Sequence, residues 1–362
     1  CKRRWRIYYD QYRYRARYDY FLGDATQDYR DLGAGDWVGT QLAYDIAVPH
    51  IGVLTVGGEL NADIQALQQY DEVSAAHVNV FRADHPDLSY GLFVQEQWRL
   101  SPAWNAYLGA RFDDAKDRKH FVSPRIALVY QASPNSAYKI LMGRAFRNPN
   151  AYEMFYDDGA TQAANPALRP ENDVTVEAAA ERRLSGHLTG VATAYHYQLR
   201  DLIDVGTNAA GRIQYQNIDS ATANGVEAEL KGNLKERIEA SASIALQRAT
   251  TAQHHSILPD SPGCVAKMRG SFPLVKNKLQ VAAAMQYVSS RETASFNQVP
   301  SYWLTDFTLT TRNLHPDFDL QFGVRNLLNQ AYYDPAGAGL IQERIRQDGR
   351  SVFLKFIWRT KE

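Results

Sequence analysis

The stretch NGVEAELKG, residues 224–232, alternates apolar and charged side chains, with Val226, Ala228 and Leu230 separated by charged residues. Successive side chains of a β-strand point to opposite faces, so this period of two residues is typical of a strand with one apolar face. The same alternation recurs over 187–199, 319–326 and 351–359. The sequence therefore predicts an all-β protein.

The connections between the predicted strands differ in length in a regular way. Short ones are expected near 48–51, 101–104, 132–136, 184–186, 232–236, 273–277 and 314–317. Long ones are expected near 23–34, 64–87, 114–119, 147–170, 205–211, 250–263, 290–300 and 330–345. They define about 16 strands, and bacterial outer-membrane barrels have an even strand number, short turns at one end and long loops at the other. We predict a transmembrane antiparallel β-barrel.

Soluble β architectures are the alternative to a membrane barrel. A propeller needs a repeat of about 40 to 50 residues, and a set of sandwich domains needs linkers; neither is visible in the sequence. The segment 5–21 could form one strand far longer than the five or six residues typical of globular sheets. Helical spacing competes only at 61–73, which could form one or two turns of helix, and at 149–159, which could form one.

The amino-acid composition argues against several classes of function. A formal net charge of zero argues against a nucleic-acid partner, which would leave a basic excess. The 22 tyrosines suit a surface that is apolar on one side and wet on the other. Cys1 and Cys264 are too few for a disulfide scaffold and lack metal-ligand spacing, so we expect no metal and no cofactor. Cys1 could be the acylated first residue of a lipoprotein, but an arbitrary start within a gene is the simpler interpretation.

The segment RAFRNPNAYEMFYDDGATQAANPALRPEN, residues 144–172, contains a long predicted loop rich in polar and aromatic residues. A loop of this length in a compact domain usually binds something or is disordered. The candidate ligand-binding residues, aromatic for packing and acidic for hydrogen bonds or a cation, are Tyr152, Phe155, Tyr156, Asp157 and Asp158.

The alternative is that this loop is shaped mainly by its own packing. Pro149, Pro166 and Pro170 would then fix extended or turn backbone, and Glu171 would be a buried structural partner. The Asp157–Gly159 triplet lacks the alternating ligands of a calcium loop, and His254 with His255 reads as a surface pair. No hydrolase, zinc-protease or phosphate-loop motif is present, so a non-enzyme is favoured.

Five segments, taken in order, resemble the C-terminal barrel of TonB-dependent outer-membrane receptors. They are GRAFRNPNAYEMFY (143–156), NPALRPEN (165–172), VEAAAERRL (176–184), YQNIDSATANGVEAEL (215–230) and FGVRNLLNQAYYDP (322–335). The positions that match the family pattern, and to which a structural role is assigned, are Arg144, Arg147, Pro149, Asn165, Pro166, Pro170, Glu171, Asn217, Gly225, Glu227 and Asn326.

The resemblance implies a bacterial outer-membrane receptor and transporter, embedded in outer-membrane lipid. Family members have 22 strands around an N-terminal plug, so the chain is expected to be the C-terminal part, with the plug, its TonB box and roughly six strands before Cys1. Implied partners are that plug, the TonB complex and a small-molecule or metal-chelate ligand such as a ferric siderophore, cobalamin, haem or a sugar. Family chains usually end on an aromatic residue, whereas this one continues for four residues past Trp358.

Two other functions remain open from the residues alone. A passive 16-stranded porin would use a water-filled channel and would fit the length and strand number. A structural or adhesive barrel, or a nonfunctional gene remnant, is the third possibility. An isolated chain with too few strands would leave open sheet edges, which are costly in lipid.

Overall fold

The computed structural model describes residues 2–22, 25–73, 78–116, 120–234, 238–252, 256–276, 278–311, 317–337 and 340–358. Over these residues the chain is almost entirely extended, with 22 strands and one five-residue helix. Eighteen strands belong to one hydrogen-bonded sheet. Sixteen strands in the described residues are eight residues or longer, which confirms the number predicted from the connections.

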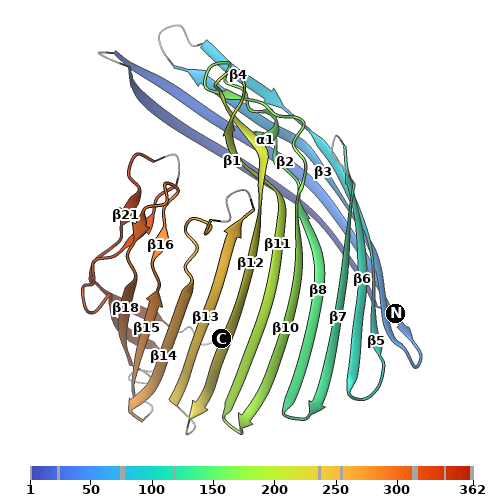
Figure 1. Ribbon diagram of the computed structural model, residues 1–362, viewed down its shortest axis with the longest axis vertical. Helices are drawn as coiled ribbons and strands as arrows, with labels where there is room; N and C mark the ends of the chain where they lie inside the picture. Colours follow the sequence, from blue (N-terminus) through green and yellow to red (C-terminus); the bar gives the residue numbers. More distant parts are fainter. Residues whose placement is uncertain are drawn as a thin grey trace. The chain divides into compact units, whose positions relative to one another are not determined.

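The long strands are drawn in Figure 1 and have the following bounds: β1 Lys2–Leu22, β2 Ala25–Val48, β3 Gly52–Glu72, β5 Asp87–Arg99, β6 Trp104–Ala115, β7 Phe121–Ser133, β8 Ser136–Arg147, β10 Glu171–Ser185, β11 Leu188–Thr207, β12 Ile213–Leu234, β13 Ile238–Thr251, β14 Cys264–Val275, β15 Leu279–Val288, β18 Tyr302–Thr311, β19 Phe318–Arg325 and β22 Ser351–Trp358. The short elements are β4 Val78–Asp84, α1 Ala151–Phe155, β9 Gln162–Ala163, β16 Arg291–Glu292, β17 Gln298–Val299, β20 Tyr333–Pro335 and β21 Arg344–Arg346.

The chain divides into two units, the first comprising residues 1–128, 141–175 and 198–220. In this unit β1, β2, β3, β5 and β6 pair antiparallel, each with the next. The β1–β2 pairing runs without interruption from Lys2 opposite Asp45 to Leu22 opposite Ala25. Strand β9 adds to β12 in the parallel sense, through Gln162 opposite Ile213.

The second unit comprises residues 129–140, 176–197 and 221–362. Strands β12, β13, β14, β15, β18, β19 and β22 form a second antiparallel series in it. The stretch 224–232 lies in β12, where Val226 and Leu230 are about half exposed, at 51% and 48%. Strands that present a row of exposed apolar side chains are what a lipid-facing sheet requires.

Buried side chains are few among the described residues, and they lie both in long strands, as Ala221 and Val288 do, and in the segments between them. Met154 in α1 is 2% exposed, Val299 in β17 is 0% exposed, and Pro149 is fully buried. Many other apolar strand residues are exposed, as Leu92 and Leu354 are. No helix within the described part of the chain has the length and apolar content needed to cross a bilayer.

Three predictions about local structure were wrong. The described residues of the expected long loop 23–34 belong to β2, and most of those of the expected loop 64–87 belong to β3 and β4. The possible helix at 61–73 is strand up to Glu72. In this segment β3 pairs with β2 on one side, and on the other with β5 up to Asp63 and with β4 from Leu67 on, and this pairing overrides the local helical spacing. The predicted helical turn within 149–159 is confirmed as α1.

Candidate functional site

The segment between β8 and β10 is built around α1, which begins with a capping box. Asn150 Oδ1 accepts from the amide of Glu153 at 2.9 Å, and Glu153 Oε2 accepts from the amide of Asn150 at 2.8 Å. Each side chain satisfies a backbone donor that the helix start leaves free. The capping box therefore stabilises the first turn of this five-residue helix.

Two carboxylates hold the base of this segment. Arg147 Nη1 donates to Glu153 Oε2 at 2.9 Å, and Arg147 Nε donates to Glu171 Oε2 at 2.6 Å. The other oxygen of Glu171 accepts from the amide of Ile203 in β11 at 2.8 Å. The arginine thus joins the end of β8, helix α1 and the start of β10.

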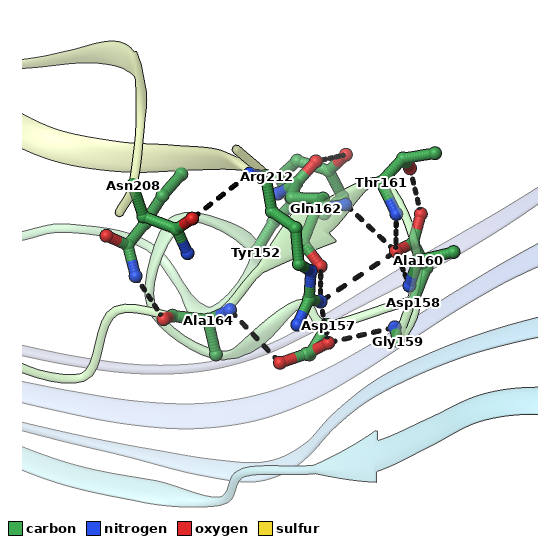
Figure 2. A network of polar contacts seen from close by, with 11 residues as sticks. Tyr152, Asp157, Asp158, Gly159, Ala160, Thr161, Gln162, Ala164, Asn208 and Arg212 are labelled. Carbon is green, nitrogen blue, oxygen red and sulfur yellow. Dashed lines mark hydrogen bonds and ion pairs between the residues drawn. The ribbon is translucent and has the colours of Figure 1, made fainter. Parts of the chain in front are cut away.

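Asp158 organises the turn after α1 and does not reach outward (Figure 2). Its Oδ1 accepts from the amides of Ala160, Thr161 and Gln162 at 2.7 to 2.9 Å, and its Oδ2 accepts from the Thr161 hydroxyl. Burial by itself raises the pKa of Asp158, but these hydrogen bonds outweigh it and hold the pKa below its usual value. Its carboxylate is committed to the turn.

Asp157 is ion paired with Arg212, which lies just before β12 (Figure 2). Arg212 Nη2 also donates to the carbonyl oxygen of Gln162. Burial tends to raise the pKa of Asp157, and hydrogen bonds from Arg212 and from the amides of Gly159 and Ala164 lower it below its usual value. With 39% of its side chain exposed, Asp157 remains accessible from outside the loop.

The three candidate aromatic residues join a larger aromatic cluster. Tyr156 lies 4.7 Å from Tyr152 and 5.2 Å from Phe81, centroid to centroid, and Tyr152 lies 6.0 Å from Tyr215. Tyr70 of β3 packs edge-on to Tyr156 at 6.5 Å. Tyr29 is stacked on Tyr70 at 5.1 Å, and Phe155 is stacked on His85 at 3.8 Å. We call all of these residues, including His85, the aromatic cluster.

The cluster combines packed rings with an accessible one. Tyr152 is 41% exposed, and its hydroxyl donates to Gln162 Oε1 at 3.2 Å. Burial raises the pKa of Tyr152 above its usual value. The phenol is protonated at neutral pH and can donate. Rings from β2, β3 and β4 that hold Tyr156 and Phe155 make a preformed surface, the kind that binds planar or apolar ligands at low entropic cost.

Asn165 and Asn217 tie the far end of the loop to β12. Asn165 Nδ2 donates to the carbonyl of Tyr215 at 2.7 Å. Asn217 exchanges two hydrogen bonds with the backbone of Arg169, accepting at 2.8 Å and donating at 2.9 Å. These amides take the place of a strand partner where the loop backbone has none.

The remaining residues of the family pattern are placed as follows. Arg144 lies over the ring of Phe121 at 4.2 Å from its centroid, while Pro166 is exposed in a turn and Pro170 precedes β10. In the other unit Gly225 and Glu227 lie in β12, with Glu227 exposed, and buried Asn326 follows β19. The structure therefore brings Arg147, Pro149, Asn165, Glu171 and Asn217 together around the α1 loop.

Several residues of this site were not predicted from the sequence. Arg212 lies 55 positions from Asp157, and Tyr70, Phe81 and His85 come from a segment predicted to be a separate loop. Arg212 has no acidic neighbour within the segment 208–212, which could have indicated that its partner lies elsewhere in the chain. Nothing in the local pattern pointed to the other three.

A metal site was not expected, and the described residues contain no group of three or more His, Cys, Asp or Glu side chains suited to a metal ion. Cys264 is a free thiol, while Cys1, His254 and His255 fall outside the described residues.

Comparison with known proteins shows which family the chain belongs to. The family model for the TonB dependent receptor-like β-barrel matches residues 2–327. The metal-pseudopaline receptor CntO of Pseudomonas aeruginosa is 24% identical over 274 residues, which cover 67% of this chain and 37% of that protein. The vitamin B12 transporter BtuB of Vibrio cholerae is 26% identical over 268 residues, 66% of this chain and 40% of that protein.

Among solved structures, the copper transporter OprC superposes with a TM-score of 0.80 at 15% identity and covers 98% of this chain and 61% of its own. The chain spans well under half the length of the two curated relatives. These relatives are receptors and transporters, which argues against the passive porin as the alternative. The chain is a bacterial outer-membrane protein and belongs to the TonB-dependent receptors, matching their β-barrel.

Proposed function

We propose that the protein imports a scarce ligand across the outer membrane with energy delivered by the TonB complex. The observation that carries this is the match of residues 2–327 to the receptor β-barrel, whose relatives include a metal-pseudopaline receptor and a vitamin B12 transporter. A ferric siderophore, another metal chelate, cobalamin or haem fits this proposal. No catalytic step is part of it.

The aromatic cluster on the α1 loop is the proposed capture site. Tyr152, Phe155 and Tyr156 would pack against the ligand, and Asp157, whose side chain is 39% exposed, would hydrogen bond to it or face a cation. Asp158 would support the loop, since its oxygens already accept four hydrogen bonds. The residues of the family pattern would hold the loop base in place.

The intact protein is proposed to be longer than this chain. A plug domain, a TonB box and about six further strands would precede residue 1, in line with 22-stranded transporters. By that proposal the 362-residue chain alone does not transport ligand, and uptake by this chain in liposomes would contradict it.

The test is uptake by the host bacterium with the full gene deleted and restored. Growth limited by iron or cobalamin should require the gene for one ligand of the panel, and the Tyr152→Ala, Tyr156→Ala double variant should reduce uptake of that ligand about tenfold or more. Tyr138→Ala serves as the matched control, because Tyr138 is an exposed tyrosine on β8 that is not part of the cluster. Equal growth of deletion and parent strains on every ligand, with the gene expressed, would contradict the proposal.

A further inference from the structure

A cavity of about 310 Å³ lies on the polar face of the β1–β6 region, apart from the aromatic cluster. An in-register row crosses its floor, in which Tyr8, Gly39, Asn61 and Ser89 stand opposite one another on β1, β2, β3 and β5. Directly opposed residues of antiparallel strands point to the same face. The side chains of this row therefore share one surface.

The rows on either side of this floor are acidic. Asp63 stands opposite Asp87 in one, and Glu59 and Asp113 flank Gly91 in the other. Asp10 is the fifth carboxylate, opposite Trp37. All five lie two positions along their strands from the floor row, so they point to the same face.

Two guanidinium groups offset part of this charge. Arg111 donates to Asp113 at 2.8 Å and to Glu59 at 3.2 Å, and Arg6 lies over the ring of Tyr8 at 4.9 Å. Among the residues that line the cavity itself, the charged ones are Glu59, Asp113, Asp114 and Arg111, which leaves a formal charge of −2. A positive charge brought into the cavity is therefore attracted even after Arg111 is counted.

The cavity also has hydrogen-bond acceptors that nothing fills. Asn61 Oδ1 and Asn148 Oδ1 are both buried and accept no hydrogen bond. The orientation of the Asn61 amide is fixed, because its Nδ2 donates to Asp63 Oδ1 at 3.0 Å. Leaving a buried acceptor unpaired is costly, so a donor is expected to occupy this space.

Aromatic rings form part of the cavity wall. Tyr8, Trp37 and Phe146 line it. A Cβ placed on Gly39 would come within 2.1 Å of the Tyr8 ring, so the glycine is what allows this tyrosine to lie flat across β2. Ring faces attract cations, most strongly those of Trp.

We propose that this cavity binds an organic cation, an ammonium or guanidinium group that donates to Asn61 and Asn148. The group lies against Trp37 and faces Glu59 and Asp113. A small organic cation is favoured over a metal ion, because the described residues offer no cluster of three metal-ligating side chains. The site goes beyond the proposed import function, since binding here can be measured without transport.

The test uses calorimetric titration of the 362-residue chain in detergent micelles with 1,4-diaminobutane. The neutral isostere butane-1,4-diol is titrated in parallel. We expect saturable binding of the diamine only, and a dissociation constant raised about tenfold or more by Asn61→Leu and by Glu59→Gln. Glu229→Gln, a carboxylate in β12 beside Lys231, should leave binding unchanged.

Folding of each variant is checked by its circular dichroism and heat-dependent gel mobility, and only folded variants are compared. Equal binding of the diol, or unchanged affinity in folded Asn61→Leu and Glu59→Gln variants, would overturn the proposal. Repeating the titration on the full-length protein identifies the source of the cation: diamine binding there points to a free small molecule. If the 362-residue chain binds the diamine and the full-length protein does not, a lysine or arginine of the full-length protein occupies the cavity.

Discussion

Arg147, the last residue of β8, is joined to Glu171, the first residue of β10, by a 2.6 Å bond between Nε and Oε2. The two residues stand at the two ends of the α1 loop, 24 positions apart in the chain. Their pairing closes the loop at its base, so a long segment with little regular structure begins and ends at a fixed point. The candidate ligand-binding residues all lie within this closed segment.

Replacing Arg147 with Gln should destabilise the loop. Two carboxylates, Glu153 and Glu171, are mostly buried and would lose their charged partner, at a cost of about 1–3 kcal/mol. The free energy of unfolding in urea and the rate of proteolysis between 147 and 171 measure this. Lys139→Gln removes the exposed pair with Glu181 and should change stability by less than about 1 kcal/mol. Equal effects of the two substitutions would contradict the anchoring role of Arg147.

The loop should loosen in acid but not near neutrality. The pKa values of Asp157 and Asp158 are lowered in the folded chain, so their contribution is complete above the unfolded value of about 3.9 and is lost as pH falls through the folded values. Hydrogen exchange of the amides at 160–162, corrected for its intrinsic pH dependence, should be constant from about pH 5 to 8 and rise below pH 4.

Asp158→Asn tests the same loop without a change of pH. The substitution keeps an acceptor but removes the charge and one acceptor oxygen, so exchange at 160–162 should be faster at pH 7 and should lose its acid dependence. Protection equal to the parent chain at pH 7 would show that the carboxylate charge does not order this turn.

Gly225→Ala should destabilise β12 strongly. An added Cβ would lie 2.4 Å from the Tyr195 ring and 2.9 Å from the carbonyl of Leu246, so the ring must move and lose its 3.2 Å hydrogen bond to Gln247. Overpacking of this kind costs about 1–3 kcal/mol in the free energy of unfolding.

Gly143→Ala in β8 is the matched control for Gly225→Ala. A Cβ there meets no atom within 4 Å, so its effect should be within about 0.5 kcal/mol. If both alanines were tolerated equally, Tyr195 would have to move at no cost, and the close approach to Gly225 would have no structural importance.

Asn326 has a left-handed backbone, with φ of 47°, and a buried side chain that accepts from the amide of Gln330 and donates to its carbonyl. Asn326→Gly keeps the backbone but loses these bonds, at about 1–2 kcal/mol, and Asn326→Ala should cost roughly 1 kcal/mol more because it adds strain. Urea unfolding of both variants separates the two contributions. An alanine variant no less stable than the glycine variant would show that the strain is relieved by backbone movement.

The period-two pattern was sufficient to predict the sheet, since alternation reports directly which side of a strand is apolar. The helical spacing within 149–159 was likewise local enough to predict the turn that forms α1. The lengths of the strands, by contrast, could not be predicted from local residues. Residues 25–34, which include Gly33, and residues 65–72 carry polar residues that favour loops. They are extended because neighbouring strands continue beside them.

The sequence by itself therefore determined the fold class, the number of long strands and the position of the α1 loop, because each depends on residues close together in the chain. Tertiary structure alone decided which residues from distant parts of the chain complete the sites. Arg212 reaches Asp157, Tyr70 reaches Tyr156, and Asn61 meets the row of Tyr8 only through strand register. Register is a property of pairing between strands, and no single stretch of sequence contains it.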